Sequence, residues 1–214
     1  MESWFNGKDA PLQAALDADN VTALHAAVNA GANVNARGRV GVTPLEYAVG
    51  HGKKETFLEL LKMGADPNLR DQEKDNAVTL AVDAFPKDPE YLVSALKHGG
   101  DPNTLRSNGD PIMGAFEARH DVKGIRQLHQ LGGDINARKR TGNPLVIDAA
   151  LADDWDVVWC LLELGAKYDY HSGLMPIEKV FADPETVPRS SPMFPYKKKS
   201  HDFLEAKGMR LPPL

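Results

Sequence analysis

A short glycine-centred motif recurs along the chain at a nearly constant interval. Its copies are Gly31-Ala32-Asn33, Gly64-Ala65-Asp66, Gly99-Gly100-Asp101, Gly132-Gly133-Asp134 and Gly165-Ala166-Lys167, at spacings of 33, 35, 33 and 33 residues. A fixed period between about 20 and 50 residues indicates a solenoid, in which each repeat packs only against its neighbours. The chain is therefore expected to consist of stacked copies of one small structural unit.

The sequence between these motifs predicts two helices per repeat. A second marker, proline followed by an aliphatic residue, recurs at Pro11, Pro44, Pro111, Pro144 and Pro176. Proline suits the first position of a helix, and glycine in a left-handed conformation ends one. Between the markers, apolar residues follow a helical spacing with two buried sides, which predicts that Leu61 and Leu161 are buried between successive repeats.

The stretch from Gly41-Val-Thr-Pro-Leu45, through Phe57-Leu-Glu-Leu-Leu61, to Gly64-Ala-Asp-Pro-Asn68 resembles the ankyrin repeat. This resemblance covers roughly residues 8 to 180 and implies an all-α ankyrin-repeat solenoid of about five to six helix–turn–helix repeats with short fingers. Residues 1–214 are then expected to form a single ankyrin-repeat domain. Its expected repeats are 8–37, 38–70, 71–104, 105–137 and 138–169, followed by an atypical capping repeat with a long insertion, 170–214.

The departures from the family pattern carry further expectations. The histidine that the family usually has after Pro-Leu is replaced by Gln13, Glu46, Met113 and Val146, so the fingers are expected to be less rigid. Asp88 is expected to cap a helix that begins at Pro89. The capping repeat is expected to contain one helix over Met175 to Ala182 and another over Ser200 to Lys207.

Composition and charge bear on the kind of partner. A net charge of −5 argues against sequence-independent binding to DNA or RNA, which requires a basic surface. The amino terminus lacks the features of a signal peptide, and no apolar run approaches the ~20 residues that span a bilayer. We expect no membrane or nucleic-acid partner and a cytoplasmic location.

Motifs for catalysis, cofactors or metals are weak. The histidines are scattered without a His-x3-His pair, Cys-x-x-Cys is missing, and neither a cofactor nor a metal site is expected. Asp153, Asp154 and Asp156 fit either a divalent-cation site or acids at a helix start. Cys160 fits a buried thiol better than a nucleophile. Asp148 indicates either a helix out of phase or a carboxylate close to the core.

Basic residues recur at the fingers. Arg37, Arg70 and Arg138 hold the same phase in their repeats, and Arg39, Arg106, Lys139 and Arg140 lie beside them. The row fits either ordinary solvated surface or a surface complementary to an acidic partner. Both interpretations place these side chains in solvent, so charge reversal is expected to leave the stability nearly unchanged.

The first helices of the repeats supply further candidates for binding. Tyr47, Gly50, His51, Glu117, Ala118, Arg119 and Phe85 are expected to be exposed on a concave surface. Arginine and aromatic residues are favoured in the centres of protein interfaces. Together these patterns predict a protein-binding surface that includes Arg37, Arg39, Tyr47, His51, Arg70, Phe85, Arg106, Glu117, Arg119, Arg138 and Arg140.

The predicted function is non-catalytic binding of a partner protein by a chain that is monomeric when unbound. Because small free-standing ankyrin-repeat proteins of this kind resemble bacterial ones, an inhibitor or immunity protein of a toxin or effector is the narrower hypothesis. Two alternatives stay open. One is a scaffold or self-assembling structural protein, and the other is an enzyme with a site in the segment from Asp169 to Lys199.

Overall fold

The computed structural model describes residues 3–168, 176–182 and 187–214. Within these ranges the secondary structure is helical, and its only β-type pairing is an isolated bridge between Arg138 and Pro144. The chain divides into two compact units, Met1–Ser107 and Asn108–Leu214, which we call the first and the second unit. The grouping of all residues into one domain stays a prediction.

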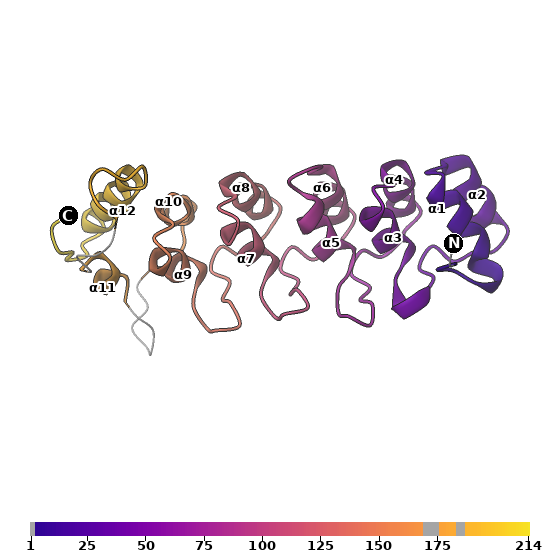
Figure 1. The fold of residues 1–214 in the computed structure, drawn as a ribbon, viewed down its shortest axis with the longest axis horizontal. Helices are drawn as coiled ribbons and strands as arrows, with labels where there is room; N and C mark the ends of the chain where they lie inside the picture. The colour runs from indigo at the N-terminus through magenta and orange to yellow at the C-terminus, as the bar shows by residue number, and fades with distance from the viewer. Residues whose placement is uncertain (1–2, 169–175, 183–186) are drawn as a thin grey trace. The chain divides into compact units, whose positions relative to one another are not determined.

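Each unit is built from pairs of helices that follow one another along the chain (Figure 1). The first unit pairs α1 (Ala10–Asp17) with α2 (Val21–Asn29), α3 (Pro44–Gly50) with α4 (Lys54–Lys62), and α5 (Ala77–Ala84) with α6 (Glu90–Lys97), and adds two 3-10 turns, η1 (Gly7–Asp9) and η2 (Arg39–Gly41). The second unit pairs α7 (Ile112–Glu117) with α8 (Val122–Gln130), α9 (Leu145–Leu151) with α10 (Trp155–Glu163), and α11 (Ile177–Phe181) with α12 (Phe194–Ala206). The predicted all-helical repeat is confirmed.

The recurrent motif ends each second helix and begins the finger. Gly31 and Gly64 have φ angles of +99° and +84°, the left-handed region that other residues rarely adopt. The Asp66 carboxylate then accepts a hydrogen bond from the Asn68 backbone N–H at 2.9 Å, which closes a turn. Asn35 reaches the following repeat, since its side-chain oxygen accepts from the Asp66 N–H at 2.8 Å. Local turns and a ladder of asparagines thus order the fingers.

Proline stands at three different places around the helix starts. Pro11 is the second residue of α1. Pro44 is the first residue of α3, as predicted. The helices α7, α9 and α11 instead begin one residue after Pro111, Pro144 and Pro176, whose backbones are extended with ψ of 144° to 150°. The expectation was wrong for these three because a proline φ suits an extended residue as well as a helical one.

The start of α6 departs from the prediction in the same way. The helix begins at Glu90 rather than at Pro89. Asp88 nevertheless accepts a hydrogen bond from the Glu90 N–H at 3.1 Å, which is the interaction expected of a capping residue.

The second helices share the core of each unit with the first helices. Leu61 and Leu161 are buried, as predicted. Cys160 is also buried, and desolvation raises the pKa of its thiol, which agrees with the interpretation of a small apolar side chain rather than a nucleophile. Asp154 and Asp156 lie at the start of α10, where acids complement the helix dipole.

The final helix pair differs from its prediction. The second helix, α12, begins at Phe194 and not at Ser200, so residues 194–199 that were expected in the insertion are helical. Phe203 of α12 packs edge-on against Trp159 of α10, with 6.0 Å between the ring centroids. The first helix is α11, and Met175, expected within it, lies outside the described residues.

Glu46 replaces the family's histidine in the second repeat and closes the base of the finger. One carboxylate oxygen accepts a hydrogen bond from the Thr43 N–H at 2.7 Å, while the Thr43 hydroxyl accepts from the Glu46 N–H at 3.2 Å. This capping box satisfies two backbone N–H groups at the start of α3. Burial raises the pKa of Glu46 to about 7, although the bonds from Thr43 oppose the shift.

Truncating Leu161 tests the helix phase. We expect Leu161→Ala to lower the free energy of unfolding by about 2–5 kcal/mol, because the side chain is fully buried and leaves a cavity. The matched control Leu151→Ala, at a position 46% exposed, should change it by less than about 0.5 kcal/mol. Chemical denaturation measures both, and equal losses would contradict the core described for the second unit.

Glu46 gives the stability a defined pH dependence. From about pH 4.5 to 7 the unfolded chain has released the Glu46 proton while the folded chain keeps it, so the free energy of unfolding falls as the pH rises through this window. Glu46→Gln keeps an acceptor for the Thr43 N–H and should lack this fall. Urea denaturation at pH 5 and pH 8 measures the difference, with Glu73→Gln at an exposed position as the control. Identical pH profiles for Glu46→Gln and the unmodified chain would show that Glu46 is not the source.

Candidate functional site

The three arginines of identical phase bind the backbone of the fingers. The Arg37 guanidinium donates to the Gly41 carbonyl at 3.2 Å, and Arg138 donates to the Gly142 carbonyl at 2.8 Å. Arg70 makes the same contact with the carbonyl of Lys74. Each side chain therefore closes its own finger, four residues further along the chain.

Two of these arginines also join successive repeats of the first unit. Arg37 donates to the Arg70 carbonyl, and Arg70 donates to the Leu105 carbonyl and the Thr104 hydroxyl, both at 2.9 Å. The expectation that charge reversal leaves stability unchanged contradicts this geometry. These side chains satisfy backbone carbonyls of the fingers rather than facing only solvent.

The other basic residues beside the fingers are placed differently. Arg106 forms a bidentate ion pair with Asp83, with both N···O distances at 3.0 Å. Arg39 and Arg140 are exposed. Lys139 is half-buried, and its ammonium lies 2.5 Å from a carboxylate oxygen of Glu117 and 2.5 Å from one of Asp148.

Glu117 was expected to be exposed and is instead buried, with 2% of its surface accessible. Desolvation raises the pKa of its carboxyl, and the nearby Lys139 partly offsets this shift. The ion pair also answers the question about Asp148, whose helix α9 is regular and whose carboxylate lies near the core with Lys139 as its partner. The expected exposure was wrong because Lys139, from a finger, covers the end of α7.

The remaining inner-helix candidates divide into two groups. Gly50, His51, Ala118 and Arg119 are exposed, as expected. Tyr47 and Phe85 are buried, with exposures of 5% and 7%, so that expectation was wrong for both. The Tyr47 hydroxyl points inward and donates to the Asp17 carboxylate, which explains its burial.

Three predicted binding residues meet at one pocket in the first unit. A pocket of about 620 Å³ is lined by Trp4, Gln13, Asp17, Arg39, Tyr47, His51 and Lys53. The rings of Tyr47 and His51 stack with 3.9 Å between their centroids, and Trp4 stands edge-on to Tyr47 at 5.9 Å. We call these seven residues the Trp4 pocket. The other predicted binding residues are not part of it: Arg37, Arg70, Phe85, Arg106, Glu117, Arg119, Arg138 and Arg140.

Backbone contacts hold Trp4 at the edge of the pocket. Its N–H donates to the Gln13 side-chain oxygen and its carbonyl accepts from the Arg39 N–H, both at 2.9 Å. A Cβ at Gly38 would lie 2.7 Å from the same carbonyl, so only glycine allows this close approach. The amino-terminal segment is thus a fixed wall of the pocket.

The polar floor of the pocket is already satisfied. The Gln13 amide donates to Asp17 at 3.0 Å and to the Tyr47 hydroxyl at 2.9 Å. The Tyr47 hydroxyl bond lowers the pKa of Asp17, which stays ionised at neutral pH. His51 donates through Nδ1 to the Tyr47 carbonyl at 2.9 Å, which leaves its Nε2 as the ring atom for other partners. The Lys53 ammonium donates to the Asp17 carbonyl at 2.5 Å.

The sequence predicted only part of this pocket. Arg39, Tyr47 and His51 were identified, whereas Trp4, Gln13, Asp17 and Lys53 were not. Their one visible signal is the large aromatic pair Trp4-Phe5 just before the first repeat. No periodic pattern marks it, because this segment precedes the repeats.

The comparisons with known proteins agree with the fold. The sequence model of the ankyrin repeat matches residues 40–72, the second of the expected repeats. Helix pairs of this type at a 33-residue period, with glycine stops and short fingers, define a protein of the repeat-solenoid class that presents surfaces for other proteins. The chain is an ankyrin-repeat protein.

Three relatives cover different shares of the chain. ZDHHC13 of Danio rerio, which is named as a palmitoyltransferase, is 31% identical over 170 residues, or 72% of this chain and 26% of that protein. The mitochondrial disaggregase of Bos taurus is 42% identical over 161 residues, which are 75% of this chain and 19% of the relative. The E3 ubiquitin-protein ligase KEG of Arabidopsis thaliana is 37% identical over 73 residues, 34% of this chain and 4% of the ligase. The chain thus spans less than a third of each relative.

Ankyrin repeats indicate a protein–protein interaction module. The ankyrin-repeat family is generally not enzymatic. Among the described helices, none combines the length and apolar character needed to cross a bilayer.

Removing one finger arginine tests its structural role. We expect Arg70→Ala to lower the free energy of unfolding by more than about 1 kcal/mol, because several hydrogen bonds worth about 0.5–1.5 kcal/mol each are lost. Lys97→Ala removes an exposed positive charge from the same unit and should cost less than about 0.5 kcal/mol. Denaturation by urea compares the two. Equal stabilities of the two variants would show that Arg70 is an ordinary solvated surface residue.

Proposed function

We propose that the chain binds an acidic segment of a partner protein at the Trp4 pocket, without catalysing a reaction. The observation that carries this proposal is the meeting of Arg39, Tyr47 and His51 with Trp4 around one pocket of about 620 Å³. Tryptophan, tyrosine and arginine are the residues that most often dominate binding energy at interfaces.

The walls of the pocket suit an aromatic or apolar side chain. Trp4 and the stacked Tyr47–His51 pair are held by hydrogen bonds before a partner arrives. A fixed aromatic surface loses little conformational entropy on binding. Such a pocket favours one inserted side chain as an anchor.

The charges around the pocket favour an acidic neighbourhood for that anchor. Arg39 and Lys53 line the pocket, and the only carboxylate among its lining residues, Asp17, already accepts from Tyr47 and Gln13. The balance is therefore positive although the chain as a whole has a net charge of −5. Complementary charge speeds association and selects among partners.

The same contacts support binding rather than catalysis. Asp17, the carboxylate that could act as a base, has a lowered pKa, and its Oδ1 already accepts hydrogen bonds from Tyr47 and Gln13. A general base at neutral pH requires a pKa raised toward the working pH. A scaffold or self-assembling protein remains the alternative function, and size-exclusion chromatography over a concentration series distinguishes it from the monomeric binder proposed here.

Inhibition is the narrower form of the proposed function. A module that covers a partner's surface blocks that surface, so an inhibitor or immunity protein would act through this binding alone. Co-expression tests this form of the proposal. The chain should suppress the activity or toxicity of the captured partner, and substitution of His51 should abolish this suppression without unfolding the chain.

Two labelled peptides of equal length test the pocket. One carries a tryptophan flanked by aspartates and glutamates, and the other the same tryptophan flanked by lysines. We expect the acidic peptide to bind more tightly and its affinity to fall as salt rises, because the Debye length shrinks to about 8 Å at physiological ionic strength. Fluorescence anisotropy measures both.

Matched variants locate the binding. Arg39→Ala and His51→Ala change exposed residues of the pocket and should each weaken the acidic peptide, whereas Lys97→Ala, which also removes an exposed basic residue of the first unit, should not. Equal binding of the two peptides, or equal losses for Arg39→Ala and Lys97→Ala, would overturn the assignment of the pocket.

A further inference from the structure

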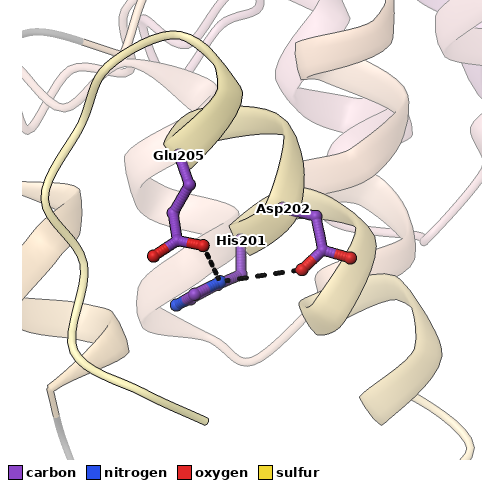
Figure 2. A group of neighbouring side chains, drawn as sticks. All are labelled: His201, Asp202 and Glu205. Carbon is purple, nitrogen blue, oxygen red and sulfur yellow. Dashed lines mark ion pairs between the residues drawn. The ribbon is translucent and has the colours of Figure 1, made fainter.

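We propose that His201, Asp202 and Glu205 of α12 form a site for a divalent transition-metal ion of the zinc type. The His201 Nδ1 atom lies 3.5 Å from a carboxylate oxygen of Glu205 and 3.9 Å from one of Asp202. All three candidate ligand atoms lie within 4.8 Å of one another. Figure 2 shows both carboxylates directed at the same nitrogen of the ring.

The contact of the other ring nitrogen, Nε2, determines which nitrogen of His201 carries a hydrogen. His201 Nε2 lies 2.8 Å from the Pro212 carbonyl oxygen, which can only accept, so Nε2 carries a hydrogen. In the neutral ring, Nδ1 then carries a lone pair, which faces the carboxylates of Asp202 and Glu205. A metal ion bound at Nδ1 would place its positive charge beside both carboxylates.

Several features of the site are those of a metal ligand set. A ligating histidine characteristically donates its other N–H to a backbone carbonyl, which orients the ring as Pro212 does here. With metal–ligand bonds of about 2.0–2.2 Å, tetrahedral ligands lie about 3.4 Å apart, close to the distance between His201 and Glu205. Asp202 and Glu205 are exposed, so rotation of the Asp202 side chain closes its longer distance.

The ligand types select the class of ion. One imidazole with two carboxylates suits zinc and its first-row neighbours, whereas calcium and magnesium prefer oxygen ligands alone. The site borders a pocket of about 480 Å³, where water can complete the coordination. An ion with three protein ligands and an open position would exchange with solvent.

Two positive groups nearby oppose the ion and set an upper limit on its affinity. Lys198 forms an ion pair with Asp202 at 2.6 Å, which a metal must loosen. Arg189, which also lines the pocket, donates to the Leu214 carbonyl at 2.6 Å. The sequence indicated no metal because its histidines lack a His-x3-His pair, whereas the His-x3-Glu spacing at His201 and Glu205 gives the same helical proximity.

Calorimetric titration of the full chain with zinc chloride at pH 7.5 tests the site. We expect binding of one ion to the site and no comparable signal with calcium chloride. Glu205→Gln and Asp202→Asn, at exposed positions, should preserve the fold and weaken binding at least as much as the roughly 10–100-fold that loss of a mere orienting partner costs. Binding unchanged in both variants would overturn the proposal.

A second histidine with two carboxylates in the same unit supplies the matched control. His120 contacts Asp154 through Nε2 at 3.3 Å and Asp156 through Nδ1 at 3.9 Å, so its two acids engage different nitrogens. Asp156→Asn should leave zinc affinity unchanged. Equal losses for Asp156→Asn and Glu205→Gln would show nonspecific binding to histidines and overturn the site.

Nitrogen NMR of His201 distinguishes the ion from a proton. Long-range ¹H–¹⁵N spectra report the state of each ring nitrogen. In the presence of zinc we expect Nε2–H with a metal-bound Nδ1, and a shift absent from Glu205→Gln. Two protonated nitrogens that do not change on adding zinc would assign the cluster to an ordinary imidazolium ion pair.

Discussion

The fingers depend on side chains to satisfy their backbone hydrogen bonds. A few backbone hydrogen bonds close the fingers, such as those from the Asp71 N–H to the Asp75 carbonyl and from the Gln72 N–H to the Val40 carbonyl, and the remaining polar groups of the main chain need other partners. Arg37 and Arg70 supply donors to carbonyls of their own finger and of the next repeat, while Asn35 supplies an acceptor across the same step. The period of 33 residues is visible in the sequence because the same contact must be rebuilt at every step.

The amino-terminal segment makes a contact with the first repeat that a finger makes one repeat later. The Asp9 carboxylate accepts from the Asn33 N–H at 2.8 Å, the role that Asn35 plays toward Asp66 one repeat later. Phe5 is buried, and the Trp4 carbonyl accepts from the Arg39 N–H. A capping segment thus completes the first repeat, and the wall of the Trp4 pocket is a consequence of that completion.

The sequence predicted what local rules determine and missed what depends on contacts between distant segments. The glycine stops and the buried faces of Leu61 and Leu161 follow from backbone conformation and helical spacing, and both were predicted. The burial of Glu117 depends on Lys139, which approaches from a separate finger. Charge at a regular phase suggested binding for Arg70, yet the carbonyls that occupy it come from turns whose shape a single sequence does not reveal.

Each proposed site draws residues from outside the regular repeats, namely Trp4 in the pocket and α12 in the ligand cluster, and the physical reason is the same. An interior repeat packs its helix faces and finger side chains against two neighbouring repeats, so few of its polar groups are available to bind a ligand. The first repeat has Gln13 where the family has a histidine, and this amide connects Trp4 to Asp17 and Tyr47. The helix α12 is thirteen residues long, and His201 on it contacts the Pro212 carbonyl beyond the helix end. Side chains that are not used for contacts between repeats can therefore converge on a pocket and on a cluster of candidate metal ligands.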